Sequence, residues 1–184
     1  MEYFSKGKRG NIYLDNGYAI KKSSQLRIKN EVKWLKILNK YKIGPKIISY
    51  NKTSFKYKFI NGDFILGFIE KNDKKIIKKI LLDVLKQCRI MDELKVNKKE
   101  MHNPVKHILI KNNGAFMIDF ERCYKTEKPK NVTQFCQFIM SNNLKSLLKK
   151  KKFKINGKKL LKTLISYKHN QSEKNFKEIL RLIN

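Results

Sequence analysis

In the first third of the chain, some apolar residues recur with the period of a β-strand and others with the period of an α-helix. Short apolar or alternating runs at 12–14, 18–20, 46–50 and 54–60 are typical of β-strands. Residues 26–40 instead carry apolar side chains at 28, 32, 35 and 38, which is the stripe of an amphipathic helix. Gly44 and Pro45 end that helix. The pattern predicts an antiparallel sheet accompanied by one helix.

The remainder of the chain has mainly the helical period. The longest predicted helix covers residues 74–94, with one continuous apolar face. Four more are predicted from apolar stripes and helix-start signals at 131–140, 142–150, 157–167 and 172–182. Asn61, Gly62 and Asp63 interrupt the pattern and are interpreted as a link. We therefore expect an α+β fold with two lobes, residues 1–60 and 61–184, in one domain.

A predicted β-hairpin lies inside the helical part. Apolar runs at 108–110 and 115–118 flank Lys-Asn-Asn-Gly, and an Asn-Gly dipeptide is a strong hairpin signal. Because the strands are antiparallel, the polar residues before the first strand lie beside Asp119, Phe120 and Glu121 after the second. A surface hairpin followed by a helix cap would give the same pattern. The arrangement nevertheless makes Asp119 a candidate functional residue.

The composition adds a large positive charge to this picture. The chain has 44 Lys and Arg against 15 Asp and Glu, a formal net charge of +29. Such a charge favours association with RNA, the ribosome or another polyanion. The alternative is a lysine-rich bias of the proteome, which the even spread of lysine along the chain supports. The charge bears on association and not on the fold.

Two absences point to the cytoplasm. The sequence has no apolar run of about 18 residues that would cross a membrane, and its first residues lack the apolar segment of a signal peptide. Its three cysteines are odd in number and lack paired metal spacing, so we expect reduced thiols. No membrane partner is expected.

Candidate phosphate-binding groups occur near the N-terminus. Glycines 7 and 10 flank Lys-Arg, and glycines let the backbone approach a phosphate closely. Lys21 follows at the end of the next strand, where its ammonium would reach the same phosphates. Glu31, the one acid of the first helix, is a possible distant partner of Lys21. A hairpin with a flexible entry, a surface lysine and a solvated glutamate is the alternative interpretation.

The order of these features resembles the protein-kinase superfamily. The most similar members are the small archaeal predicted serine/threonine kinases, related to RIO-type kinases and to the kinase of the tRNA threonylcarbamoyl-modification complex. The resemblance spans residues 4–140 and rests on Gly-Lys-Arg-Gly, Ile-Gly-Pro-Lys, Ile-Asp-Phe-Glu-Arg and Asn-Val-Thr-Gln-Phe. It implies a minimal two-lobed kinase-like fold, with a sheet and one helix in the N-lobe and a catalytic hairpin in a helical C-lobe.

The resemblance also implies ATP and Mg²⁺ as ligands and gives roles to individual residues. Lys21 corresponds to the phosphate-binding lysine, Glu31 to its helix partner, and Asp119 to the metal ligand, in Asp-Phe-Glu instead of Asp-Phe-Gly. The resemblance also implies a phosphate loop that contains Ser5, Gly7 and Gly10. It further implies a hinge that would hold adenine, formed by Phe59, Ile60 and Asn61.

The chain departs from the kinase pattern in the catalytic loop. His107 stands where kinases have a metal-binding asparagine, and five residues earlier His102 stands in place of the aspartate. If the loop is two residues longer, Glu100 becomes the acid–base residue, and this is the register we prefer. Asn103 would then remain as a metal ligand beside His107.

Two functions remain open from the sequence. One is an ATP- and Mg²⁺-dependent Ser/Thr kinase with an unknown protein substrate, or an ATPase. The other is a non-catalytic kinase-fold module that associates with tRNA, the ribosome or another polyanion. The first function is favoured by the presence together of Lys21, Glu31 and Asp119. The altered catalytic loop, the missing Ala-Pro-Glu segment and the positive charge favour the second.

Overall fold

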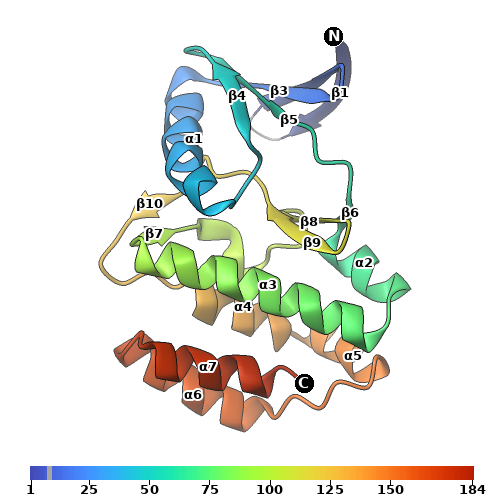
Figure 1. The fold of residues 1–184 in the computed structure, drawn as a ribbon, viewed down its shortest axis with the longest axis vertical. Coiled ribbons are helices and arrows are strands. Elements are labelled where there is room, and N and C mark those ends of the chain that lie inside the picture. The colour runs from blue at the N-terminus through green and yellow to red at the C-terminus, as the bar shows by residue number, and fades with distance from the viewer. Residues whose placement is uncertain (8–9) are drawn as a thin grey trace.

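The N-terminal lobe is built on a five-stranded antiparallel sheet with strand order β1-β2-β3-β5-β4 (Figure 1). The computed structural model describes residues 1–7 and 10–184. The strands of this sheet are β1 (Glu2–Gly7), β2 (Gly10–Asp15), β3 (Tyr18–Lys22), β4 (Ile47–Tyr50) and β5 (Ser54–Lys58). The four strands expected from the apolar pattern are therefore confirmed. β1 was not expected, because its exposed Tyr3 and Phe4 do not alternate with polar residues in the manner of a half-buried strand.

Helix α1 (Gln25–Leu38) packs against this sheet through the predicted stripe. Ile28, Val32, Leu35 and Leu38 are all buried, and Trp34 is buried beside them. The last residues of the expected helix form a separate 3₁₀ turn, η1 (Asn39–Tyr41). Gly44 follows with φ +79°, and a Cβ there would lie 2.6 Å from Leu35 Cδ2. Glycine is therefore required where the chain leaves the helix.

The C-terminal lobe is mainly helical, and Figure 1 shows α3 crossing its centre between the β8–β9 hairpin and α4. Its helices are α2 (Ile65–Lys71), α3 (Lys74–Glu93), η2 (Lys99–His102), α4 (Asn131–Ile139), α5 (Asn142–Lys150), α6 (Gly157–His169) and α7 (Glu173–Leu182). Its short strands are β6 (Asp63–Phe64), β7 (Val96–Asn97), β8 (Ile108–Lys111), β9 (Gly114–Met117) and β10 (Tyr124–Lys125). The described chain is thus an α+β fold with two lobes, as expected.

Two details of the expected C-lobe are corrected. The link at 61–63 ends inside a strand, because Asp63 of β6 pairs with Ile110 of β8 and joins a sheet of order β6-β8-β9. The hairpin turn is one residue earlier than the Asn-Gly dipeptide. Asn112 and Asn113 occupy its centre with φ of 51° and 54°, and Gly114 begins β9. Asparagine tolerates these positive φ angles, which a tight hairpin turn requires at both central residues.

One hydrophobic core is continuous through both lobes, and it includes the buried residues of α1, α3 and α4. The three cysteines are free thiols and all are buried. Across the described residues, the search for a helix with the length and apolarity of a membrane span finds none.

A buried carboxylate connects three helices of the C-lobe. Asp92, at the end of α3, is fully buried and accepts hydrogen bonds from the backbone and side-chain nitrogens of Asn131 at 2.9 and 2.7 Å. It also accepts from the hydroxyl of Tyr167 on α6, at 3.1 Å. Burial raises the pKa of Asp92 to about 6 despite these donors. Asp92 therefore holds α3, α4 and α6 together.

Candidate functional site

Residues from β3, α1 and the segment after β9 meet at one point between the lobes. The ammonium of Lys21 lies 2.7 Å from Glu31 Oε2 and 2.9 Å from Asp119 Oδ1. Lys21 and Glu31 are ten residues apart, whereas Lys21 and Asp119 are 98 apart. The structure therefore brings together the three residues to which the kinase resemblance gives the roles of phosphate-binding lysine, helix partner and metal ligand.

Glu31 is held in place from two sides. It belongs to the buried residues of α1 and is only 2% exposed. Its Oε2 accepts from Lys21, and its Oε1 accepts from the backbone nitrogen of Phe120 at 3.0 Å. Burial raises the pKa of Glu31, while Lys21 and the Phe120 amide oppose that rise. The solvated-glutamate alternative is therefore wrong.

Asp119 adopts a backbone conformation that few residues favour. Its φ is 63°, in the left-handed region that aspartate tolerates better than most residues. The side chain remains partly exposed, at 36%, while Phe120 beside it is fully buried. Burial acts to raise the pKa of Asp119, but Lys21 outweighs it and holds that pKa below its usual value. Asp119 thus presents a carboxylate toward the open side of the site.

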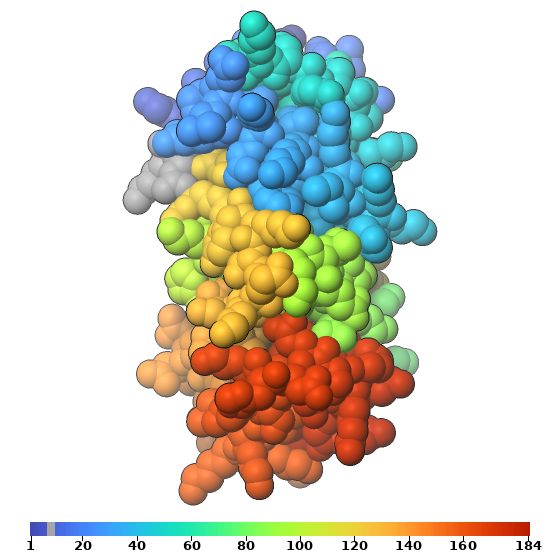
Figure 2. Space-filling view, turned by 90° about the vertical axis from the view of Figure 1, so that its left-hand side faces the viewer, coloured from blue at the N-terminus to red at the C-terminus, as the bar shows by residue number. Residues whose placement is uncertain are grey.

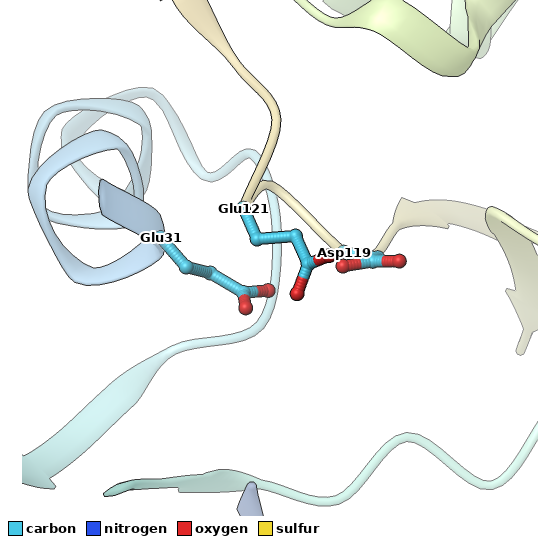
Figure 3. A group of neighbouring side chains, drawn as sticks. All are labelled: Glu31, Asp119 and Glu121. Atoms are coloured by element: carbon cyan, nitrogen blue, oxygen red, sulfur yellow. The ribbon is translucent and has the colours of Figure 1, made fainter. Parts of the chain in front are cut away.

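Glu121 is a member of the site that the sequence did not single out. Its carboxylate is 2% exposed and its Oε2 lies 3.4 Å from Lys21 Nζ. Figure 3 shows the carboxylates of Glu31, Asp119 and Glu121 directed toward one another, and their ligand atoms lie within 4.8 Å. The position after Asp-Phe was the available signal, since glutamate there replaces the glycine of the kinase pattern.

Three carboxyl groups surround the single ammonium of Lys21. Burial disfavours the charge on Lys21, but Glu31 and Asp119 more than compensate and raise the pKa of Lys21 above its usual value. Lys21 therefore stays cationic, with the carboxyl groups of Glu31, Asp119 and Glu121 around its ammonium. Hard carboxylate oxygens of this kind are the ligands that Mg²⁺ prefers, so the donor set fits that ion.

A second hydrogen-bonded contact fixes α1 against the segment after Asp119. The side-chain nitrogen of Asn30 donates to the carbonyl oxygens of Glu121 and Cys123 at 2.7 and 3.1 Å. Trp34 Nε1 in turn donates to Asn30 Oδ1 at 3.1 Å. The yellow segment that carries these residues lies directly against blue α1 in Figure 2. The spacing of Glu31 and Asp119 is therefore set by backbone contacts as well as by their charges.

Lys98 is a further residue that sequence reasoning missed. Its side chain is fully buried, and its ammonium donates to the carbonyl oxygen of Asp119 and lies 3.3 Å from Glu100 Oε2. Glu100, in η2, also lies 3.3 Å from Arg122 Nη1 and is 12% exposed. The ammonium of Lys98 therefore contacts both Glu100 and Asp119 and links the two residues.

The other candidates of the catalytic loop lie nearer the surface. His102 is exposed, and its Nδ1 lies 3.1 Å from the carbonyl oxygen of Lys99. Asn103 is also exposed, at the end of η2. His107 is half-buried, with Nδ1 3.8 Å from Asp119 Oδ2. Burial lowers the pKa of His107, and Lys98 lowers it further, which favours the neutral imidazole that can bind a metal. Of these three residues, His107 is the one that the structure places beside Asp119.

The residues on either side of the predicted phosphate loop belong to strands β1 and β2. Ser5 and Gly7 belong to β1, where Gly7 is paired with Gly10 of β2. Lys8 and Arg9, between these glycines, lie outside the described residues. A Cβ on Gly10 would lie 2.6 Å from the carbonyl oxygen of Lys22, so the close approach of β3 also requires glycine there.

The expected hinge follows β5, where the chain passes from one lobe to the other. Phe59 donates its backbone N–H to the carbonyl oxygen of Gly17 at 3.2 Å, and its ring packs on Phe4 with centroids 5.3 Å apart. Phe59 and Ile60 are half-buried, and Asn61 is exposed. The three residues therefore lie at the lobe boundary where the resemblance expects them.

Comparison with known proteins gives limited information. No protein-family model matches the chain. The chain is similar to the uncharacterized protein MJ1211 of Methanocaldococcus jannaschii, with 32% identity over 75 residues. The aligned stretch covers 41% of this chain and 64% of that relative, less than two thirds of its length. This similarity assigns neither a family nor an activity.

Proposed function

We propose that the protein is an ATP- and Mg²⁺-dependent phosphotransferase of the small archaeal Ser/Thr kinase type, or an ATPase built on that plan, acting in the cytoplasm. The observation that carries the proposal is the contact of Lys21 with both Glu31 and Asp119. A cation for phosphate oxygens and a carboxylate for the metal are the groups that phosphoryl transfer requires side by side. Their order along the chain is the one that resembles kinases.

Each residue of the site has a defined part in this proposal. Lys21 would bind phosphate oxygens, with Glu31 orienting its ammonium. Asp119 and Glu121 would hold Mg²⁺, which supplies positive charge to the phosphates. His107, 3.8 Å from Asp119, is a further possible ligand. Phe59, Ile60 and Asn61 would hold adenine, and Ser5, Gly7 and Gly10 would belong to the segment that binds the phosphates.

The proposal is tested by nucleotide binding. Calorimetric titration of the full chain with ATP, with and without Mg²⁺, is compared between wild type and Lys21→Ala. We expect a loss of affinity of roughly tenfold or more, because a buried charge contact to phosphate is worth about 1.5–3 kcal/mol. Lys22→Ala removes an exposed neighbouring lysine that lies 4.8 Å from the Tyr13 ring, and it should leave affinity within about twofold. Equal affinities in the two variants would refute the site.

A second function, a non-catalytic module that uses the same fold, is favoured by one observation. Glu100, the preferred acid–base candidate, is already paired with Lys98 and Arg122. A carboxylate that neutralises two cations is less available to accept a proton from a hydroxyl. Nucleotide binding without phosphate release or transfer to an added protein would establish this second function.

A further inference from the structure

A groove lies on the outer side of the N-lobe, between α1 and the turn that joins β4 to β5. Its volume is about 460 Å³. α1 lines it with Gln25, Ile28, Lys29, Val32, Lys33 and Lys36, and the opposite wall is Tyr50, Asn51 and Lys52. Figure 2 faces this side of the molecule, with α1 in blue and the β4–β5 turn in teal above it.

The charge of this groove is entirely positive. Four lysines line it and no carboxylate does. Within residues 1–7 and 10–184, none of these lysines forms an ion pair with an acidic side chain. The one carboxylate of α1, Glu31, is two residues from Lys29 and Lys33, which places it about 200° around the helix. The groove and the Lys21 site therefore occupy opposite faces of α1, and the protein does not neutralise the groove.

The floor and rim of the groove are suited to a flat, partly apolar group. Ile28 and Val32 form an apolar floor, at 1% and 5% exposure, while Tyr50 is 52% exposed. The ammonium of Lys36 lies 4.2 Å from the centre of the Tyr50 ring and donates to its hydroxyl. The ring is thereby held beside the cations.

The wall opposite α1 is also ordered before any ligand arrives. Asn51 Oδ1 accepts from the backbone nitrogens of Thr53 and Ser54 at 3.0 and 2.8 Å. This contact fixes the turn that carries Lys52. Because the cations and the ring are held by the fold, little conformational entropy is lost when a ligand binds.

We propose that this groove binds single-stranded nucleic acid. Lys29, Lys33 and Lys36 form a row about 10 Å long on α1, which tracks a phosphate backbone, and a base stacks on Tyr50. A cationic groove with an interleaved aromatic ring is the arrangement that binds single strands without sequence preference. The volume of 460 Å³ accommodates one nucleotide-sized group. An acidic peptide would satisfy the lysines but offers no base to stack.

The test measures binding of the full chain to fluorescent twelve-nucleotide oligo(U) and oligo(dT) by anisotropy, over a range of salt concentrations. Lys29→Gln with Lys33→Gln removes two charges from the groove. Lys158→Gln with Lys162→Gln is the matched control, because it removes two exposed lysines at the same spacing from α6. Tyr50→Ala is paired with Tyr41→Ala, which removes another exposed tyrosine, 47% accessible, outside the groove.

We expect the groove double variant to lose roughly tenfold or more in affinity at low salt. Its slope of log affinity against log salt should fall by about 1.4, since each single-strand phosphate contact contributes about 0.7. Tyr50→Ala should lose at least about fivefold, the lower range for one stacked base. Both controls should stay within about twofold. Both oligonucleotides carry the phosphates and bases that the groove would bind. Tighter binding of oligo(U) would indicate RNA as the ligand, and tighter binding of oligo(dT) would indicate DNA.

Three outcomes would overturn the proposal. Equal losses in the two double variants would mean that diffuse charge, and not the groove, binds the strand. An unchanged affinity in Tyr50→Ala would remove the stacking contact. Displacement of oligo(U) by oligoglutamate at equal charge concentration would assign the groove to an acidic peptide. We expect ATP binding to be unchanged in these variants, because the groove contains no residue of the Lys21 site, so the outcomes are independent of the proposed function.

Discussion

The ammonium of Lys98 donates a hydrogen bond to the backbone carbonyl of Asp119, and the Lys98 side chain is fully buried. This contact supports Asp119 from inside the C-lobe while Lys21 holds its carboxylate from the N-lobe. The same ammonium lies 5.0 Å from the centre of the Phe120 ring. A backbone in the left-handed region persists only when its surroundings constrain it, and Lys98 supplies part of that constraint.

Replacing Lys98 with methionine is expected to destabilise the protein. Methionine retains most of the side-chain volume but leaves the Asp119 carbonyl and one contact of Glu100 without their partner. A buried charge network that loses one member loses about 2–4 kcal/mol in free energy of unfolding. Urea denaturation measures the change, and Lys99→Met at the exposed neighbouring position should change stability by less than about 0.5 kcal/mol. Equal stabilities would show that Lys98 does not support Asp119.

Asp119→Asn should separate turnover from nucleotide affinity. Asparagine tolerates a positive φ as well as aspartate does, so the fold should be retained. The neutral amide is a weaker metal ligand, and Mg²⁺-dependent turnover should fall at least about 100-fold while metal-free ATP affinity changes little. Phosphate release and calorimetry measure the two quantities, with Asp63→Asn as an exposed control. Turnover at the wild-type level in Asp119→Asn would contradict the metal assignment.

Glu121 should contribute to Mg²⁺ binding even without nucleotide. The cluster of three carboxyl groups predicts that about 10 mM Mg²⁺ stabilises the wild type by about 1 kcal/mol, which raises Tm by roughly 2–4 °C. Glu121→Gln removes one ligand and should reduce that rise by half or more. Glu127→Gln, at an exposed side chain, should not. Thermal unfolding with Mg²⁺ or with chelator gives the comparison, and an undiminished rise in Glu121→Gln would exclude it as a ligand.

The acid–base residue is expected to be Glu100 and not His102. A carboxylate is a hydrogen-bond acceptor, as the acid–base role requires, and Glu100 is linked to Asp119 through Lys98. His102 is instead exposed at the end of η2. Glu100→Gln should lower turnover by about 100-fold or more at matched ATP affinity, and His102→Ala by little. The reverse result transfers the role to His102. No loss in either variant would show that neither side chain acts in phosphoryl transfer.

Asp92→Asn should alter the dependence of stability on pH. The pKa of about 6 exceeds the value of about 3.9 in an unfolded chain, so the folded protein binds more protons between those pH values. This contribution lowers the free energy of unfolding as pH rises from about 4 to 6, by about 3 kcal/mol in total. The variant lacks that decline, so its stability relative to wild type should increase over the interval.

Urea denaturation at pH 4, 5, 6 and 7 measures the difference between Asp92→Asn and wild type. Asp73→Asn, which keeps a capping side chain at the start of α3, controls for the loss of an exposed aspartate. A difference that does not change with pH would mean that Asp92 keeps its usual affinity for protons.

The sequence by itself determined the order and type of the longer helices and of six strands. Strand and helix periods are local, so β2 to β5, α1, α3 and the later helices could be predicted from residues a few positions apart. It also indicated Lys21, Glu31 and Asp119, because their order relative to those elements resembles kinases. Helix α2 and strands β1, β6, β7 and β10 were missed. Pairing with a partner strand, and not a period of their own, stabilises these four strands.

Only the tertiary structure decided which charged residues are buried and which residues they contact. Glu121, Lys98 and Asp92 resemble surface residues in the sequence, yet each is buried by partners that include residues distant in the chain. Burying a charge is costly unless opposite charges or hydrogen-bond partners compensate, and those partners are chosen by the fold. The sequence could name Lys21, Glu31 and Asp119 as candidates, but their contacts follow from how the two lobes meet.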